Sequence, residues 1–200
     1  MKSRVIGLTG QTGAGKSTAA RIIASEYGCS IVDADMVARE ALAPGSSCLK
    51  RLAEIFGYDI IDEKGECRRR LLAQRAFSSK ENTEKLNLVT HPWIIRRSRE
   101  YIELYRRDPG GIILFDCPLL FECGGETLCD LVIAVTAPEE LRLERIINRD
   151  GLTQEEAMQR IGVQNDTDYY TQRADYVIDG SRSMDEIKAE LLSVIGEKLL

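Results

Sequence analysis

Residues 10–17 combine glycines, a lysine and a serine in a spacing that suits phosphate binding. They read Gly-Gln-Thr-Gly-Ala-Gly-Lys-Ser, the pattern G-x-x-x-x-G-K-[ST]. Glycines let the backbone approach an anion, so that its N–H groups surround phosphate oxygens. Lys16 adds a positive charge, and the Ser17 hydroxyl can bind Mg²⁺. We therefore expect a nucleoside triphosphate to bind here as its magnesium complex. The residues expected to contact it are Gly10, Thr12, Gly13, Ala14, Gly15, Lys16, Ser17 and Thr18.

Three aspartates follow predicted strands at the edge of the sheet where ligands bind in open α/β folds. Asp116 ends an apolar run, so it could hold Mg²⁺ directly or through water, or it could be a structural carboxylate. Asp35 is a candidate general base, with an alternative role as a helix N-cap paired with Arg39. Asp33 is expected to be structural or to support its neighbours. The expected metal ligands are therefore Ser17 and Asp116.

Arg142, Arg145 and Arg149 lie three and four residues apart in a predicted helix. Arg142 has Glu139 three residues before it, so we expect an ion pair on a solvated face. Arg145 and Arg149 have no acidic residue three or four positions away. We expect these two to lie in a lid and to neutralise charge on the transferred phosphoryl group, with Arg149 the stronger candidate.

Five short apolar runs are typical of strands buried on both faces of a parallel sheet. They are residues 5–9, 29–32, 111–115, 131–135 and 176–178. A helix is expected over 16–27, and three further helices are expected to begin with capping boxes. The expected capping pairs are Thr136 with Glu139, Thr153 with Glu156 and Ser183 with Glu186. The sequence predicts an α/β fold: a P-loop NTPase-type three-layer sandwich with a five-stranded, mostly parallel sheet.

About eighty residues between the second and third strands carry helical patterns only, too many for a simple crossover. The helical runs are near 47–56, 68–77, 80–88 and 93–107. We expect a helical insertion that covers a substrate. Pro92 is expected in the first turn of its last helix, with His91 beside the N-cap.

Composition limits the classes of function. The chain has 200 residues, 44% of them hydrophobic, and a net charge of −5 without a basic stripe. Nucleic-acid binding is not expected, because it needs clustered Lys and Arg. The six cysteines do not match a zinc site, and no apolar run is long enough to span a membrane. We expect a cytoplasmic protein that is a monomer or a weak homo-oligomer.

A phosphate loop alone leaves several reactions open. The N-K-x-D and D-x-x-G strings of GTPases and the L-S-G-G-Q string of transporter ATPases are absent. A small-molecule kinase is therefore the favoured class. A kinase for a nucleoside monophosphate or similar acceptor, or a nucleotide-sensing protein without turnover, remains possible.

Further strings make the sequence resemble the dephospho-coenzyme A kinase family. They run in the family's order over nearly the whole chain and are residues 7–10 (Gly-Leu-Thr-Gly), 32–35 (Val-Asp-Ala-Asp), His91-Pro92, 116–122 (Asp-Cys-Pro-Leu-Leu-Phe-Glu), 149–153 (Arg-Asp-Gly-Leu-Thr), Arg160-Ile161 with Gln164, and 173–179 (Arg-Ala-Asp-Tyr-Val-Ile-Asp). The sequence departs from the family pattern at Gln11-Thr12, at Thr90 and at Gly180-Ser181.

The resemblance implies that ATP phosphorylates the ribose 3′-hydroxyl of dephospho-CoA, the last step of coenzyme A synthesis. It implies a single kinase domain with a core (about 1–45, 110–140 and 165–200), a helical CoA-binding insertion (about 46–109) and a lid (about 141–164). It implies catalytic roles for Lys16, Asp35 and Arg149 and a nucleotide contact for Arg145. The substrate contacts that it implies are Thr9, Asp35, Arg39, His91, Pro92 and Leu119.

Overall fold

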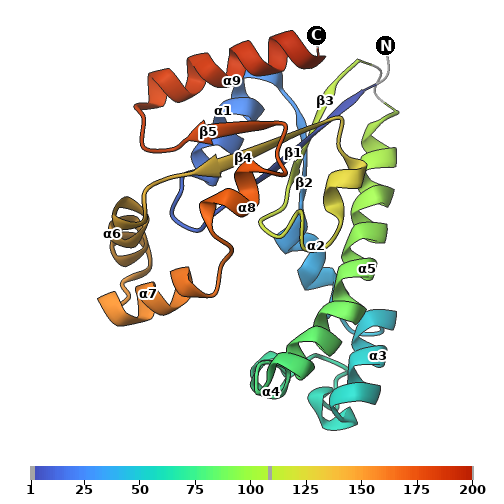
Figure 1. The fold of residues 1–200 in the computed structure, drawn as a ribbon. Coiled ribbons are helices and arrows are strands. Elements are labelled where there is room, and N and C mark those ends of the chain that lie inside the picture. Colours follow the sequence, from blue (N-terminus) through green and yellow to red (C-terminus); the bar gives the residue numbers. More distant parts are fainter. Residues whose placement is uncertain (1–2, 108–109, 200) are drawn as a thin grey trace. The chain divides into compact units, whose positions relative to one another are not determined.

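A five-stranded sheet organises the larger part of the chain. The computed structural model describes residues 3–107 and 110–199. The strands are β1 (Arg4–Gly10), β2 (Ser30–Asp33), β3 (Ile112–Asp116), β4 (Leu131–Thr136) and β5 (Tyr176–Asp179). Their order is β2-β3-β1-β4-β5, and β1 pairs in parallel with β3 and β4, as β4 does with β5 (Figure 1). The expected α/β fold and all five expected strands are confirmed.

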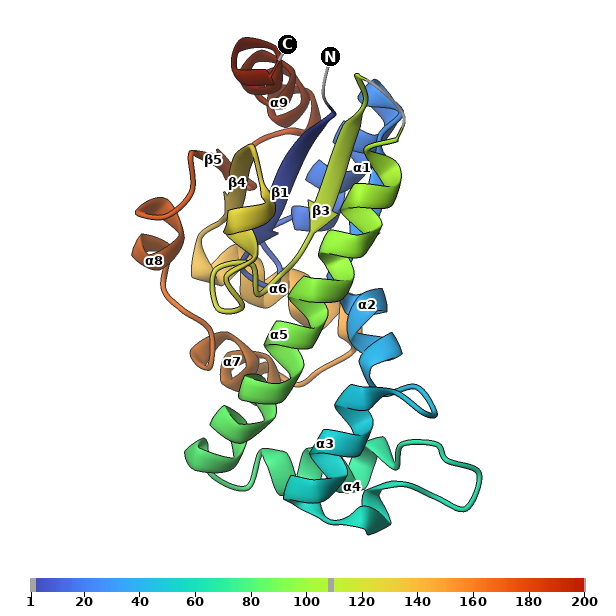
Figure 2. The ribbon, with the colours of Figure 1, turned by 90° about the vertical axis from the view of Figure 1, so that its right-hand side faces the viewer.

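Helices cover both faces of this sheet. On one face lie α1 (Lys16–Tyr27) and α9 (Met184–Leu199), which contact each other and contribute to the main apolar core (Figure 1). On the other face α8 (Thr167–Thr171) lies against β4 and β5 (Figure 2). Between β4 and α8 the chain forms α6 (Glu139–Asp150) and α7 (Gln154–Gly162), which pack on each other. The short helix η2 (Gly125–Leu128) precedes β4.

Contacts divide the chain into two compact units. One contains the residues up to Val32 and those from Ile102 onward, and the other is Asp33–Tyr101. The second unit is helical, and its elements are α2 (Ala34–Ala41), α3 (Ser47–Phe56), η1 (Tyr58–Ile60), α4 (Arg69–Ala76) and most of α5 (Lys80–Tyr105). It has its own apolar cluster, in which Leu49, Leu52 and Ile60 are almost completely buried. The helical content expected of the insertion is thus present.

The expected break near Pro92 is wrong, because α5 continues through this residue. Proline inside a helix removes one backbone hydrogen bond and costs about 3 kcal/mol. Here Leu86 and Val89 before the proline and Trp93 after it pack against the same apolar cluster. Burial on both sides of Pro92 therefore holds the helix together, so His91 lies inside the helix and not beside an N-cap.

Two of the three expected capping boxes are confirmed. Thr153 with Glu156 begins α7, and Ser183 with Glu186 forms the same reciprocal hydrogen bonds before α9. The pair of Thr136 and Glu139 is wrong, because β4 extends to Thr136 and Pro138 is the N-cap of α6. Thr136 is the last residue of β4, so it lies too far before the first turn of α6 to cap this helix.

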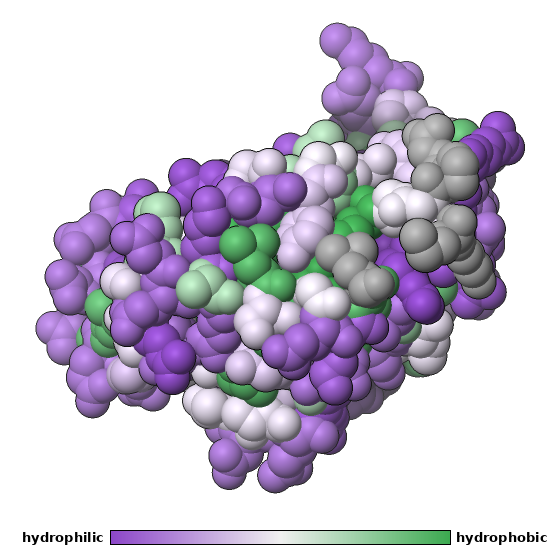
Figure 3. All heavy atoms as spheres, turned by 90° about the horizontal axis from the view of Figure 1, so that it is seen from above, coloured by the Kyte–Doolittle hydropathy of each residue, from purple (hydrophilic) through white to green (hydrophobic). Residues whose placement is uncertain are grey.

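One face of the molecule is largely polar. Hydrophilic side chains predominate on the face seen from above, and hydrophobic ones form small separate groups (Figure 3). No helix within the described part of the chain has the length and apolarity that crossing a membrane requires.

Replacing Leu52 by alanine tests the core of the helical unit. Leu52 is completely buried in α3, whereas Ile55 in the same helix is 37% exposed. Leu52→Ala should lower the free energy of unfolding by about 2–5 kcal/mol, and Ile55→Ala should lower it by less, because only the first leaves a cavity. Urea denaturation followed by circular dichroism measures both. Equal losses would contradict the packing described here.

Candidate active site

The phosphate loop lies where the sequence places it, between the end of β1 and the start of α1. Gly10 is the last residue of the strand, and Lys16, Ser17 and Thr18 form the first turn of the helix. Gly15 is the N-cap of α1 with φ 109°, a conformation that other residues rarely adopt. No side chain caps this helix end, so its N–H groups are available to a ligand.

Four backbone donors of the loop form no hydrogen bond within the described part of the chain. In the described part of the chain the N–H groups of Gly13, Gly15, Lys16 and Ser17 donate no hydrogen bond, whereas that of Ala14 donates to the Gln11 carbonyl at 3.1 Å. Converging free N–H groups at a helix N-terminus form an anion-binding site. The Ser17 side chain is exposed, and Thr18 lies beside it with its hydroxyl accepting from Arg21. The geometry fits a polyphosphate.

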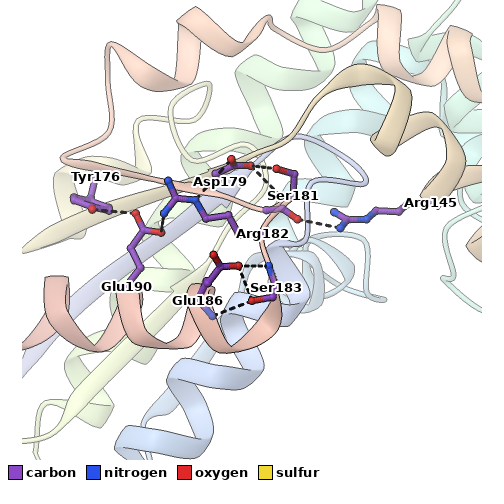
Figure 4. Close-up of polar contacts among 9 residues, drawn as sticks. Arg145, Tyr176, Asp179, Ser181, Arg182, Ser183, Glu186 and Glu190 are labelled. Carbon is purple, nitrogen blue, oxygen red and sulfur yellow. Dashed lines mark hydrogen bonds and ion pairs between the residues drawn. The ribbon is translucent and has the colours of Figure 1, made fainter.

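Arg145 holds carbonyl groups of the loop. Its guanidinium donates to the carbonyl oxygens of Gly13 (3.2 Å), Ala14 (3.3 Å) and Gly180 (3.0 Å). Figure 4 shows the last contact, beside the turn in which Ser181 donates to the Asp179 carboxylate. Among the described residues it forms no ion pair, so its positive charge stays near the anion site. Whether it also contacts nucleotide stays a prediction.

The expectation for Arg142 is wrong. Its residue surface is only 4% exposed, and burial lowers its pKa. It does not lie on a solvated face: it donates to the Thr12 carbonyl at 3.0 Å and to the Gln164 amide oxygen at 3.2 Å, and Glu139 acts on it only through its charge. The spacing of charges along one helix could not indicate this, because the partners belong to other segments.

The expectation that Arg149 lacks an acidic partner is also wrong. Its guanidinium donates to both carboxylate oxygens of Asp150, at 2.8 Å each. Arg160 of α7 donates to the same carboxylate at 2.7 Å, and the Arg149 hydrogen bond is the largest cause of the lowered pKa of Asp150. Asp150 was missed from the sequence because only acidic residues three or four positions from Arg149 were considered, and Asp150 is the next residue. Arg149 is half exposed, so it can still turn towards a ligand.

Asp116 forms an ion pair with Lys16, so the lysine of the loop and the carboxylate ending β3 lie together. Asp116 pairs in register with Leu8 of β1, which explains this proximity. Thr9, also on β1, is buried and donates to the Pro118 carbonyl at 3.0 Å, while Leu119 is half exposed in the turn that follows β3.

The residues fit a magnesium ion that is held mainly by its ligand. Among the described residues no group of three or more His, Cys, Asp or Glu side chains could hold a metal ion. Mg²⁺ usually keeps several waters and binds through one or two protein oxygens together with substrate phosphates. Ser17 and Asp116 provide two such oxygens beside the free N–H groups, which is enough for a metal that arrives with a nucleotide.

The structure locates the candidate site residues of the helical unit in α2 and α5 or next to them. Asp33 is the N-cap of α2, since its carboxylate accepts from the N–H groups of Asp35 (2.8 Å) and Met36 (3.1 Å). The alternative in which Asp35 caps this helix is therefore wrong; Asp35 lies exposed in the first turn. Arg39 is exposed and donates to the Met36 sulfur at 3.5 Å. His91 and Pro92 lie inside α5.

One polar network of the helical unit was not anticipated. Glu40 accepts from Tyr101 at 2.7 Å and from Arg97 at 3.0 Å, and it joins α2 to α5. These hydrogen bonds, that of Tyr101 first, lower the pKa of Glu40. The partners are about sixty residues apart, so no local spacing could have indicated the contact. The network fixes the helix that carries Asp35 and Arg39.

A cavity of about 550 Å³ opens at the end of β4. It is bordered by Thr136 to Glu139, by Arg142, by residues 161, 162 and 164–167, by Gln11 and by Asp179. Gln11, Gln164 and Asn165 were missed as site residues from the sequence. The signals were that Gln164 stands in one of the strings that resemble the family and that Gln11 departs from the family pattern.

Comparison with known proteins supports the same family. A family profile described as dephospho-CoA kinase matches residues 4–186. A protein of that name from Corynebacterium diphtheriae is 45% identical and covers 92% of each chain, and one from Bacillus licheniformis is 39% identical over 94% of this chain and 92% of its own. The chain belongs to the dephospho-CoA kinase family.

Solved structures agree with this membership. A Thermus thermophilus protein of known crystal structure has a TM-score of 0.79 at 31% identity, with 98% of each chain covered. A dephospho-CoA kinase from Campylobacter jejuni has a TM-score of 0.61 at 27% identity, covering 98% of this chain and 97% of its own. A shikimate kinase from Acinetobacter baumannii, at 20% identity and a TM-score of 0.56, shares the fold.

In this member of the family, Gly180 should be needed for the shape of the phosphate loop. A Cβ atom built on Gly180 would lie 1.8 Å from the Ala14 carbonyl oxygen, so one of the two segments would have to move. Gly180→Ala should weaken ATP binding about 10–100-fold, because relieving such overlap costs about 1–3 kcal/mol. Isothermal titration calorimetry measures the affinity.

Gly196→Ala in α9 is the matched control, since nothing lies within 4 Å of a Cβ atom there. It should bind ATP as the unmodified protein does. Unchanged ATP affinity in Gly180→Ala would show that the loop does not depend on this contact.

Proposed function

We propose that this chain transfers the γ-phosphoryl group of ATP to the ribose 3′-hydroxyl of dephospho-CoA, giving coenzyme A and ADP. The observation that carries the proposal is the set of four free N–H groups at Gly13, Gly15, Lys16 and Ser17 beside the Lys16 ammonium. Family membership supplies the acceptor, which a phosphate loop alone does not define. The kinase for another acceptor and the sensor without turnover are therefore not favoured.

The nucleotide half of the site uses the loop and α1. The free N–H groups bind phosphate oxygens, and Lys16 exchanges its contact with Asp116 for the β- and γ-phosphates. Ser17 and Asp116 would hold Mg²⁺, which offsets charge on the phosphates when it is bound. Thr12, Ala14 and Thr18 complete the contact surface around the loop, which begins at Gly10.

The acceptor half uses the helical unit and the turn after β3. Asp35 orients the 3′-hydroxyl group and accepts its proton as the oxygen attacks the γ-phosphorus. It is exposed in the first turn of α2, where the Asp33 cap fixes the backbone, so it can meet a substrate. Thr9, Arg39, Leu119 and the His91-Pro92 segment are proposed to contact dephospho-CoA. The insertion (46–109) and the lid (141–164) are proposed to close over the reactants and exclude water.

Arg149 is the proposed lid cation. It would rotate from Asp150 towards the γ-phosphoryl group as the lid closes, and Arg160 would keep Asp150 neutralised. Arg145 stays on the carbonyl groups of the loop and adds its charge from there. We further propose a cytoplasmic monomer or weak homo-oligomer.

The proposal is tested by ADP release from ATP and Mg²⁺ with and without dephospho-CoA, with the product identified by mass spectrometry. Release that depends on dephospho-CoA, with one phosphate added to it, is the expected result. ADP release that ignores dephospho-CoA would reject the acceptor. ATP binding without any ADP release would favour the sensor.

Asp35→Asn tests the proposed base. The amide keeps the size of the side chain but cannot accept the proton, so kcat should fall about 10²–10⁴-fold while the ATP dissociation constant changes little. Asp185→Asn, an exposed carboxylate in the first turn of α9, is the control and should keep normal turnover. Steady-state kinetics give kcat, and calorimetry gives ATP affinity. Near-normal turnover of Asp35→Asn would remove this residue as the base.

A further inference from the structure

The backbone of Thr12 in the phosphate loop is held by hydrogen bonds at both its N–H and its carbonyl group. Its N–H donates to the Gln164 amide oxygen at 2.9 Å, and its carbonyl accepts from Arg142 at 3.0 Å. Arg142 also donates to the same Gln164 oxygen at 3.2 Å. Thr12, Arg142 and Gln164, from three segments, therefore form a closed set of hydrogen bonds that holds the two peptide units on either side of the Thr12 Cα atom.

Holding the Thr12 carbonyl fixes the next N–H group. A trans peptide is planar, so the N–H of Gly13 points away from the carbonyl of Thr12. The Gly13 N–H is one of the four free donors of the loop. Gly13 has φ 77° and no side chain to restrict it, so this peptide could rotate if Arg142 released the carbonyl.

Arg142 makes these hydrogen bonds from a buried position, where its charged group is removed from water. It is 4% exposed, and its described partners are a carbonyl and an amide oxygen, not a carboxylate. Burying a guanidinium that hydrogen-bonds to no carboxylate is unfavourable even with the charge of Glu139 acting on it, so a role in stability alone would not explain it. Its cationic head is also close to the loop that receives the anion.

A second pair of contacts joins the loop to the same returning segment. Gln11 donates to the Asn165 carbonyl at 3.3 Å, and Asn165 donates to Glu122 at 2.8 Å. Gln164 and Asn165 follow α7 directly, where the chain returns from α6 and α7 to the sheet. Movement of α7 would therefore reach the phosphate loop through these two residues.

We propose that Arg142 and Gln164 are positioning residues that orient the Thr12–Gly13 peptide for phosphate binding and couple the phosphate loop to α7. This inference rests on the proposed function, because it takes the phosphates of ATP as the ligand of the loop. Neither residue needs to touch the nucleotide. Replacing either residue should weaken the binding of ATP and leave the binding of dephospho-CoA unchanged.

Gln164→Met removes the acceptor oxygen and keeps the length of the side chain. The dissociation constant for ATP with Mg²⁺ and the KM for ATP should rise about tenfold, as for loss of a buried hydrogen-bond acceptor. The KM for dephospho-CoA should stay within about twofold. Gln164→Glu retains an oxygen for both donors and should recover most of the ATP affinity.

Gln159→Met, at an exposed position of the preceding helix α7, is the matched control and should behave as the unmodified protein. The inference is overturned if Gln164→Met binds ATP normally, or if both KM values and the melting temperature change together without recovery in Gln164→Glu. Calorimetry with ATP needs no acceptor. If the chain binds ATP but transfers no phosphate, the proposed function is wrong. The calorimetric comparison of the variants would still test the positioning role.

Discussion

The phosphate loop can offer its N–H groups to an anion because its carbonyl groups are held by other parts of the chain. Arg142 holds the carbonyl of Thr12, and Arg145 holds those of Gly13 and Ala14. Each planar peptide then directs the following N–H to the opposite side. Two arginines of α6 therefore act on the backbone, so the site depends on a helix that is more than 120 residues away in sequence.

The parallel sheet supplies the second constraint. Because β3, β1 and β4 run in parallel, Asp116 ends beside the loop that begins at Gly10. The Lys16 ammonium is thus neutralised by Asp116. In the proposed function, a nucleotide with its metal replaces this ion pair by two others, in which Lys16 meets phosphate and Asp116 meets Mg²⁺. The net desolvation is small because both charged groups are paired before and after the exchange.

The sequence predicted the features that depend on local pattern. Apolar runs located all five strands, and the glycine spacing located the loop and α1. It failed where tertiary contacts decided the outcome. The packing of Val89 and Trp93 keeps α5 continuous through Pro92. Because β4 extends to Thr136, this residue does not form the expected helix cap. Arg142 was misjudged for the same reason, because its partners are Thr12 and Gln164 and not a neighbour in its helix. Such contacts leave no periodic signal in one sequence.

The exchange of ion pairs is tested most directly by calorimetric titration of Asp116→Asn with ATP, with and without Mg²⁺. The account predicts that the variant binds metal-free ATP at least as tightly as the unmodified protein, because Lys16 no longer has to leave a carboxylate. It also predicts that the gain in affinity on adding Mg²⁺ falls about tenfold, as for the loss of one charged metal contact. A variant that keeps the full gain from Mg²⁺, or that loses affinity equally with and without the metal, would contradict it.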